Sequence, residues 1–242
     1  MRFLSLNNRN LKEIFRDPVT LLLGVAMPIA LLALFSSLYQ KSQMEIFSPT
    51  MLTPAITIFS FSFLVMFSGI LLGKDRNGAF MTRLLTTPLR TVDFVLAYLL
   101  PFIPVALFQI VVCYATGIFL GASVEQWLPI IIIHLLVALT CISLGIILGS
   151  TLTLNQISGV GSLLITAISL FSGAWMDLKM VGGFFELFGN LMPFSHAISA
   201  VRAITSGAAL GELINDLFWV LAYAIICFVL SVYALKWKTR RA

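Results

Sequence analysis

The chain has 242 residues, of which 60% are hydrophobic and 10% are charged. An ordinary soluble domain has about a quarter of its residues charged, so this composition argues against a soluble fold and for an all-α integral membrane protein. The formal net charge of +5 indicates attraction to anionic lipid headgroups rather than binding of nucleic acid, because the basic residues gather beside apolar runs.

Six apolar runs are long enough to cross a bilayer once each, since an apolar helix of about 20 residues spans the ~30 Å hydrocarbon core. None of them contains an Asp, Glu, Lys or Arg. The runs are Val19–Tyr39, Met51–Gly73, Phe94–Leu120, Trp127–Gly149, Gln156–Met176 and Leu217–Leu235. With short connections between them, residues 1–242 are predicted to form a single transmembrane domain without a nucleotide-binding domain.

Three basic clusters flank these runs: one precedes the first, one separates the second from the third, and one follows the last. They consist of Arg2, Arg9, Lys12 and Arg16, of Lys74, Arg76, Arg83 and Arg90, and of Lys236, Lys238, Arg240 and Arg241. Positive charge marks the cytoplasmic side. Both termini are therefore expected in the cytoplasm, and an even number of spans agrees with their lying on the same side. The protein is expected in the cell membrane.

Residues 1–17 are predicted to form an amphipathic helix that lies in the cytoplasmic interface, and the alternative is a frayed basic tail. The two proposed faces carry Leu4, Leu11, Ile14 and Phe15 on one side and Arg9, Lys12, Glu13 and Arg16 on the other. Such a division of apolar and charged residues is typical of interfacial helices.

The second span carries an aromatic ridge, because Phe59, Phe63 and Phe67 recur at intervals of four residues. On a helix this spacing places the three rings on one face. The ridge could bind an amphipathic solute, and contact with lipid or packing within the bundle is the alternative.

The segment 74–93 between the second and third spans contains an apolar pattern of its own. Phe80, Met81, Leu84 and Leu85 recur at i, i+1, i+4 and i+5, whereas Thr82, Arg83 and Thr86 face elsewhere. Pro88 disfavours helix at the residue before it. The pattern predicts a short cytoplasmic helix with an exposed apolar face, which needs the lipid surface, the bundle or a docked protein as its partner.

The fifth span carries a stripe of hydroxyl side chains formed by Ser158, Ser162, Thr166 and Ser169. Small and hydroxyl residues on one face allow helices to approach closely, and they can also line a partly wet path. Both interpretations are open from the sequence.

The segment 177–216 before the last span is largely apolar near Val181–Leu191, yet this part is too short to cross a bilayer. Gly189, Asn190 and Pro193 interrupt it before a second helical stretch near Ser195–Thr205. The pattern predicts an outer helical hairpin of re-entrant or interfacial type, whose backbone must be satisfied by protein or water. A loosely folded outer loop is the alternative.

No catalytic or metal site is predicted. His134 and His196 have no neighbours that would make a catalytic triad or a ligand cluster, and the three cysteines lie in spans without metal-site spacing. Gly69, Gly73 and Lys74 are spaced one residue too closely for a phosphate-binding loop, and no Ser or Thr follows for magnesium. The chain is therefore not expected to be an enzyme or to bind a cofactor.

The energy source of a transport process can also be inferred from the spans. Ion-coupled carriers usually keep ionisable residues inside the membrane, where each costs ~2.5 to 3.5 kcal/mol on insertion scales. None of the six runs contains one of the four charged residue types. This favours coupling to hydrolysis by a partner through the segment 74–93.

Three stretches make the chain resemble the ABC-2 type permeases, the membrane subunits of ATP-driven exporters with six spans and cytoplasmic termini. They are the basic lead into Arg16-Asp17-Pro18, the segment Gly78-Ala79-Phe80-Met81-Thr82-Arg83-Leu84-Leu85-Thr86-Thr87-Pro88, and Leu191-Met192-Pro193 before the last span. The resemblance covers nearly the whole chain, and the second stretch is its most specific part.

The resemblance implies that Phe80, Met81, Arg83, Leu84 and Leu85 form a coupling helix on a separate cytoplasmic ATPase subunit, which would hold ATP and Mg²⁺. It also implies a second permease subunit, identical or different. The pathway between the two subunits, for an amphipathic or hydrophobic substrate, would be lined largely by the second and fifth spans. Their candidate residues are Phe59, Phe63, Phe67, Ser158, Ser162, Thr166 and Ser169.

Two other functions are compatible with the sequence. One is a non-transporting membrane module for immunity or assembly, which would bind its partner through the outer hairpin. The other is a stand-alone carrier or channel.

Overall fold

The computed structural model describes residues 2–77, 90–176, 178–208 and 210–239. Within these ranges the chain is helical and has no strand. Six helical segments are long and apolar enough to span a membrane, which confirms the all-α fold with six candidate spans. The proposed coupling residues Phe80, Met81, Arg83, Leu84 and Leu85 lie outside the described residues.

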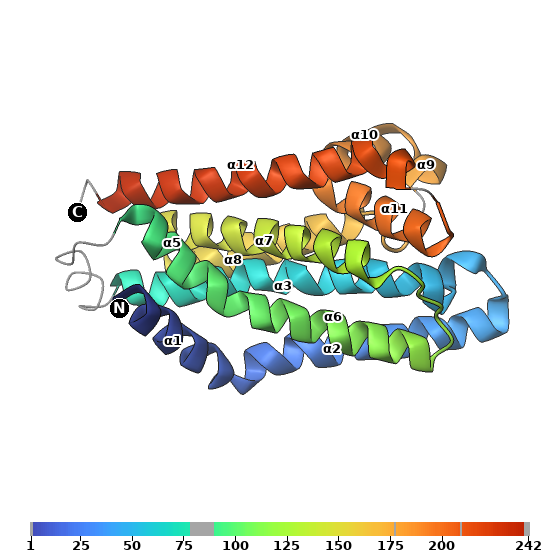
Figure 1. The fold of residues 1–242 in the computed structure, drawn as a ribbon, viewed down its shortest axis with the longest axis horizontal. Helices are drawn as coiled ribbons and strands as arrows, with labels where there is room; N and C mark the ends of the chain where they lie inside the picture. The colour runs from blue at the N-terminus through green and yellow to red at the C-terminus, as the bar shows by residue number, and fades with distance from the viewer. Residues whose placement is uncertain (1, 78–89, 177, 209, 240–242) are drawn as a thin grey trace.

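The spans run side by side in an elongated bundle, and the two termini lie at the same end of it (Figure 1). The elements are α1 (Arg2–Phe15), α2 (Pro18–Ser42), η1 (Glu45–Phe47), α3 (Pro49–Asn77), α5 (Thr91–Leu99), η2 (Leu100–Phe102), α6 (Ile103–Phe119), α7 (Trp127–Thr151), α8 (Leu154–Phe171), α9 (Leu178–Val181), α10 (Gly183–Leu191), α11 (Pro193–Thr205), η3 (Leu210–Leu213) and α12 (Ile214–Thr239). We call the end that holds the termini and Arg9, Lys12, Lys74, Arg90 and Lys236 the basic end. The other end, with η1 and α9 to α11, is the opposite end.

The third span consists of α5 and α6 with the 3₁₀ turn η2 between them. Pro101 lies within this turn, and Pro104 follows at the start of α6. Because proline lacks the backbone N–H that an α-helix needs and its ring collides with the preceding turn, the regular helix is interrupted at this point.

The fifth span is shorter than the sequence predicts. The apolar run continues to Met176, but α8 ends at Phe171. Gly173 has φ 72°, a left-handed conformation that is typical of the residue following a helix and that favours glycine. Trp175 therefore lies beyond α8, where the chain folds back toward α3.

The centre of the bundle is α3, which packs closely against α7. A Cβ added to Gly149 would lie 2.6 Å from the Gly69 carbonyl oxygen, and one added to Gly145 would overlap with the Ser68 hydroxyl and the Val65 carbonyl. The two backbones thus meet directly over more than one turn. Gly145 and Gly149 therefore serve close helix packing.

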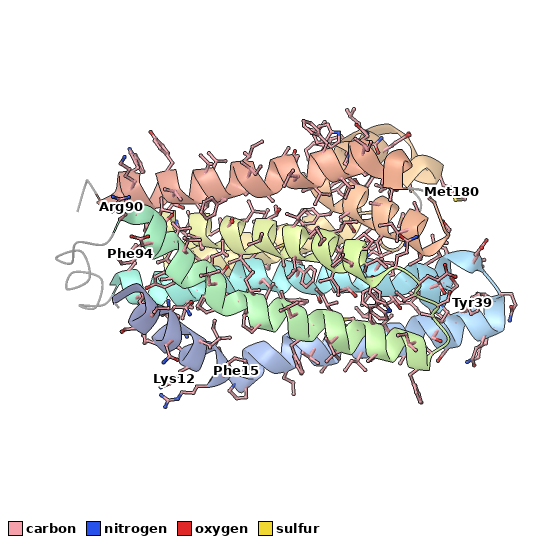
Figure 2. All side chains as sticks on the ribbon, in the orientation of Figure 1. Lys12, Phe15, Tyr39, Arg90, Phe94 and Met180 are labelled. Atoms are coloured by element: carbon pink, nitrogen blue, oxygen red, sulfur yellow. The ribbon has the colours of Figure 1, made fainter. Side chains whose placement is uncertain are left out.

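The helix predicted for residues 1–17 is present as α1, and one face of it packs on the bundle. Leu6, Asn10 and Ile14 are buried, whereas Leu4 and Phe15 are 65% and 56% exposed. Figure 2 shows Lys12 and Phe15 pointing away from the bundle. The burial of Asn10 has a clear cause, because its side-chain amide donates a hydrogen bond of 3.0 Å to the Ala97 carbonyl in α5.

The two helices of the predicted outer hairpin differ in their surroundings. One face of α11 is buried, and the helix packs against α3, α7 and α12. In α10, Phe184, Leu187 and Leu191 are exposed, while the Phe184 ring contacts Phe171 at the end of α8, with centroids 6.0 Å apart. An exposed apolar helix thus lies beside the end of a span.

Candidate functional site

The aromatic ridge of α3 is buried within the subunit, since Phe59, Phe63 and Phe67 are only 5 to 8% exposed. Phe59 and Phe63 make an edge contact with centroids 5.7 Å apart, and Phe63 and Phe67 stack at 6.2 Å. These distances and angles are those of favourable aromatic pairs. The ridge is therefore a continuous column of rings along the central helix.

The hydroxyl stripe of α8 has the opposite exposure. Ser158, Ser162 and Thr166 are exposed, and thus do not mediate helix packing inside the chain. Their hydroxyls donate to carbonyls of the same helix, at 3.3 Å to Leu154, 2.8 Å to Gly159 and 3.0 Å to Ser162. Since a hydroxyl oxygen has two acceptor lone pairs, the stripe can accept hydrogen bonds from donors outside the subunit.

The packed face of α8 is formed by other residues. A Cβ on Gly161 would be 3.4 Å from the side chain of Met66, and Ile157 lies close to Gly69 and Gly73. This contact with α3 turns the hydroxyl stripe away from the bundle.

Trp175 connects the ridge with the stripe, a role that the sequence did not reveal. Its indole N–H donates a hydrogen bond of 2.8 Å to Ser169 Oγ. The same ring contacts Phe59 edge-on at 5.5 Å and stacks on Phe35 of α2 at 5.2 Å. Of the four stripe residues, Ser169 is thus the one that the structure brings to the aromatic column.

A cavity of about 680 Å³ opens at the opposite end of the bundle. This volume lies in the range typical of small-molecule pockets. Its lining comes from η1, α3, the residues after α8, and α9 to α12, and consists of Glu45, Ile46, Met51, Ser172, Gly173, Met176, Leu178, Met180, Asn190, Ser195, His196, Ile198, Ser199, Arg202 and Asp216. The lining combines ionisable groups with thioether and aliphatic side chains.

Arg202 of α11 holds one wall of this cavity together. Its guanidinium donates to the carbonyls of Met51 at 3.0 Å, Gly173 at 3.3 Å and Ala174 at 3.3 Å. Gly173 and Ala174 lie in the turn just after α8, whereas Met51 lies in the first turn of α3. Arg202 therefore fixes the turn after α8 against the start of α3.

His196 and Asp216 form an ion pair at the same end, with 2.6 Å between Nδ1 and the carboxylate. The second ring nitrogen lies 2.9 Å from the Asn190 carbonyl. The hydrogen bond with Asp216 raises the pKa of His196 above its ordinary value, although desolvation opposes this. Both ring nitrogens of His196 are thus used in contacts that join α11 to α10 and α12.

Among the described residues, no group of three His, Cys, Asp or Glu side chains could hold a metal ion. Neither Trp175 nor Arg202 had been singled out as a site residue by the sequence. Only a general preference of Trp for the ends of membrane spans could have drawn attention to Trp175.

Comparisons with known proteins relate the chain to membrane transport proteins. The family model described as "ABC-2 type transporter" matches residues 1–206. The chain is similar to a protein named "Putative transport permease ycf38" from Pyropia yezoensis, with 27% identity over 84% of this chain and 73% of the relative. The protein of the same name from Porphyra purpurea is 28% identical over the same shares.

Proposed function

The chain belongs to the ABC-2 type transporter family, and from this premise we propose that it is the permease subunit of an ATP-driven exporter. Family membership and the six candidate spans make it a multi-pass membrane transport permease. The further proposal is that a separate cytoplasmic ATPase subunit, which binds ATP and Mg²⁺, drives it. The contact would be made through Phe80, Met81, Arg83, Leu84 and Leu85.

The exposed hydroxyl face of α8 is the observation that carries this proposal. Lipid tails offer no hydrogen-bond donor to the outward oxygens of Ser158, Ser162 and Thr166. A second permease subunit would cover this face and enclose a path between the two copies. Trp175, which donates to Ser169 and contacts Phe59, links this helix to the aromatic column.

The surroundings of this path favour an amphipathic or hydrophobic substrate. Hydroxyl oxygens of α8 would accept hydrogen bonds from its polar part. Phe59, Phe63 and Phe67 are buried within the subunit, so in this proposal they would back the path through Trp175, and a substrate would reach their rings only when the helices move apart. The cavity at the opposite end, next to Gly173 and Met176, is a suitable outlet.

The arrangement of charges supports an orientation with both termini in the cytoplasm of the cell. Arg9, Lys12, Lys74, Arg90 and Lys236 lie at the end of the bundle that holds the termini (Figure 1). Because basic residues accumulate on the cytoplasmic side, the cavity end would face outward.

The deciding experiment is purification of the tagged chain from its native membrane in mild detergent, with measurement of ATP hydrolysis by the complex. Leu84→Asp with Leu85→Asp should abolish binding of the ATPase subunit and leave membrane insertion intact, because two charges interrupt the apolar face. The matched control is Thr82→Asp with Thr86→Asp, which adds the same charge on another face and should retain the partner.

Normal partner binding by the Leu84→Asp, Leu85→Asp variant would exclude the proposed docking residues. A wild-type chain that purifies without any ATPase would instead favour a stand-alone carrier, a channel or a binding module.

A further inference from the structure

The last turn of α3 contains a buried carboxylate, Asp75, which is only 6% exposed. It lies two residues before the end of the helix at Asn77. The Arg9 guanidinium of α1 donates to both carboxylate oxygens, at 2.7 Å for one of them, and the Tyr98 hydroxyl of α5 donates at 2.6 Å. Three helices that are distant in the sequence thus meet at one charged group.

The carboxylate is well satisfied by these contacts. An unpaired buried charge would be very costly, whereas charge-assisted hydrogen bonds, above all from a bidentate arginine, are short and strong. The bond to Asp75 accordingly raises the pKa of Arg9. Next to this site, Asn10 donates to the Ala97 carbonyl at 3.0 Å, which adds a second polar link between α1 and α5.

The neighbouring residue Arg76 makes contacts with a different helix. Its guanidinium donates to the carbonyls of Ser150 and Leu152 at the end of α7. These carbonyls belong to the group at a helix C-terminus that has no partner within the helix, and the positive charge also complements the helix dipole. The end of α3 is therefore held to α1 and α5 by Asp75 and to α7 by Arg76.

Apolar side chains could join the same helices without the desolvation cost of a buried ion pair. Hydrogen bonds differ from apolar contacts because their donors and acceptors must keep a defined direction. The Asp75 cluster thus fixes how α1 and α5 are oriented on α3, at the point where the chain leaves α3 for the segment 78–89.

We propose that Asp75 is a positioning residue for energy coupling, which makes α1 and α5 move together with the end of α3 when the ATPase subunit displaces the segment 78–89. This inference rests on the function proposed above for that segment. Arg76 would transmit the same displacement to α7. Motion delivered to one short segment would in this way reach four helices.

The test is hydrogen exchange of the purified permease–ATPase complex in lipid nanodiscs, without nucleotide and after trapping with ATP and vanadate. In the wild type, trapping should change the exchange of α1 amides together with those at the end of α3. Asp75→Asn should reduce the α1 response by about fivefold or more, the lower range of coupling between sites, while ATP hydrolysis persists.

Glu13→Gln is the matched control, because Glu13 contacts the same Arg9 at 2.7 Å but both side chains are more than a third exposed. It should keep the α1 response. Tyr98→Phe, which removes one donor and no charge, gives a milder reduction if Asp75→Asn does not fold. Exchanging the partners in Arg9→Asp with Asp75→Arg should restore part of the response.

An α1 response in Asp75→Asn and Tyr98→Phe equal to that of the wild type would overturn the proposal, and so would a wild-type complex in which trapping leaves α1 unchanged. Failure of the proposed function is a separate result, because no ATPase would then purify with the wild-type chain. In that case, faster exchange of α1 in Asp75→Asn than in Glu13→Gln would still establish the structural link but not its part in coupling.

Discussion

The indole N–H of Trp175 donates a hydrogen bond of 2.8 Å to Ser169 Oγ, and the ring of the same residue contacts Phe59. Trp175 lies beyond the end of α8, whereas Phe59 belongs to the central helix α3. One side chain therefore joins the hydroxyl stripe and the aromatic column, the two features from which the proposed pathway is built.

The Trp175–Ser169 bond can be measured with a double-mutant cycle. Trp175→Phe removes the donor and Ser169→Ala removes the acceptor, and each should lower the free energy of unfolding by ~1 kcal/mol. If the two groups interact, the double variant should lose about 1 kcal/mol less than the sum of the single variants. Denaturant unfolding in a fixed detergent provides the three values, and strictly additive losses would mean that the bond contributes nothing.

The exposed stripe leads to a prediction about transport. Ser162→Leu adds bulk and removes the outward acceptor, and should reduce ATP-dependent export of a fluorescent amphipathic probe by about tenfold, equal to ~1.4 kcal/mol on the barrier. Ser162→Ala removes only the acceptor and should have a smaller effect. Unchanged export in Ser162→Leu, or export lost together with dissociation of the two permease subunits, would favour a role in subunit packing.

The six spans could be predicted from the sequence because hydrophobicity and charge act over whole segments. The end of α8 could not, since Gly173 and Trp175 continue the apolar run while the left-handed backbone at Gly173 ends the helix. Contacts between Trp175 and Phe59 depend on this reversal, and hydropathy does not report it.

The N-terminal helix α1 shows a second kind of contact that could not be predicted from the sequence. An amphipathic pattern predicted its existence, but it did not show that Asn10 is buried in the bundle beside Leu6 and Ile14. The buried amide is satisfied because its nitrogen donates to the Ala97 carbonyl and its oxygen accepts from Arg9. Ala97 lies in another helix, so the local pattern could not have indicated this contact.

The close contact of α3 with α7 predicts different effects for the same substitution at two glycines. Gly145→Ala places a Cβ against the Ser68 hydroxyl and the Val65 carbonyl, and overpacking of this kind costs about 1–3 kcal/mol. For Gly159→Ala there is nothing within 4 Å of the added Cβ, so stability should be unchanged or rise by up to ~1 kcal/mol from helix propensity. Thermal unfolding of both variants checks this, and equal melting temperatures would contradict the close packing.

The ion pair between His196 and Asp216 predicts that stability depends on pH. Its hydrogen bond raises the pKa of His196 in the folded protein above the ordinary value of 6.5. A raised folded-state pKa means that the folded protein holds the proton more tightly, so the stabilisation is fully present below about pH 6.5 and is lost as pH rises through the raised value. The side chains are 14% and 25% exposed, so solvent screens the pair only in part.

His196→Gln isolates this contribution, because glutamine can form hydrogen bonds but does not titrate in this range. The melting temperature of the wild type should exceed that of the variant by more at pH 6 than at pH 9, and the change in this difference should be about 2–4 °C if the pair contributes ~1 kcal/mol. Asp216→Asn should abolish the same pH dependence, since the neutral amide no longer favours the protonated imidazole. A difference between wild type and His196→Gln that is the same at both pH values would show that the histidine contributes by packing on Trp219, which it stacks against at 5.3 Å, and not by its charge.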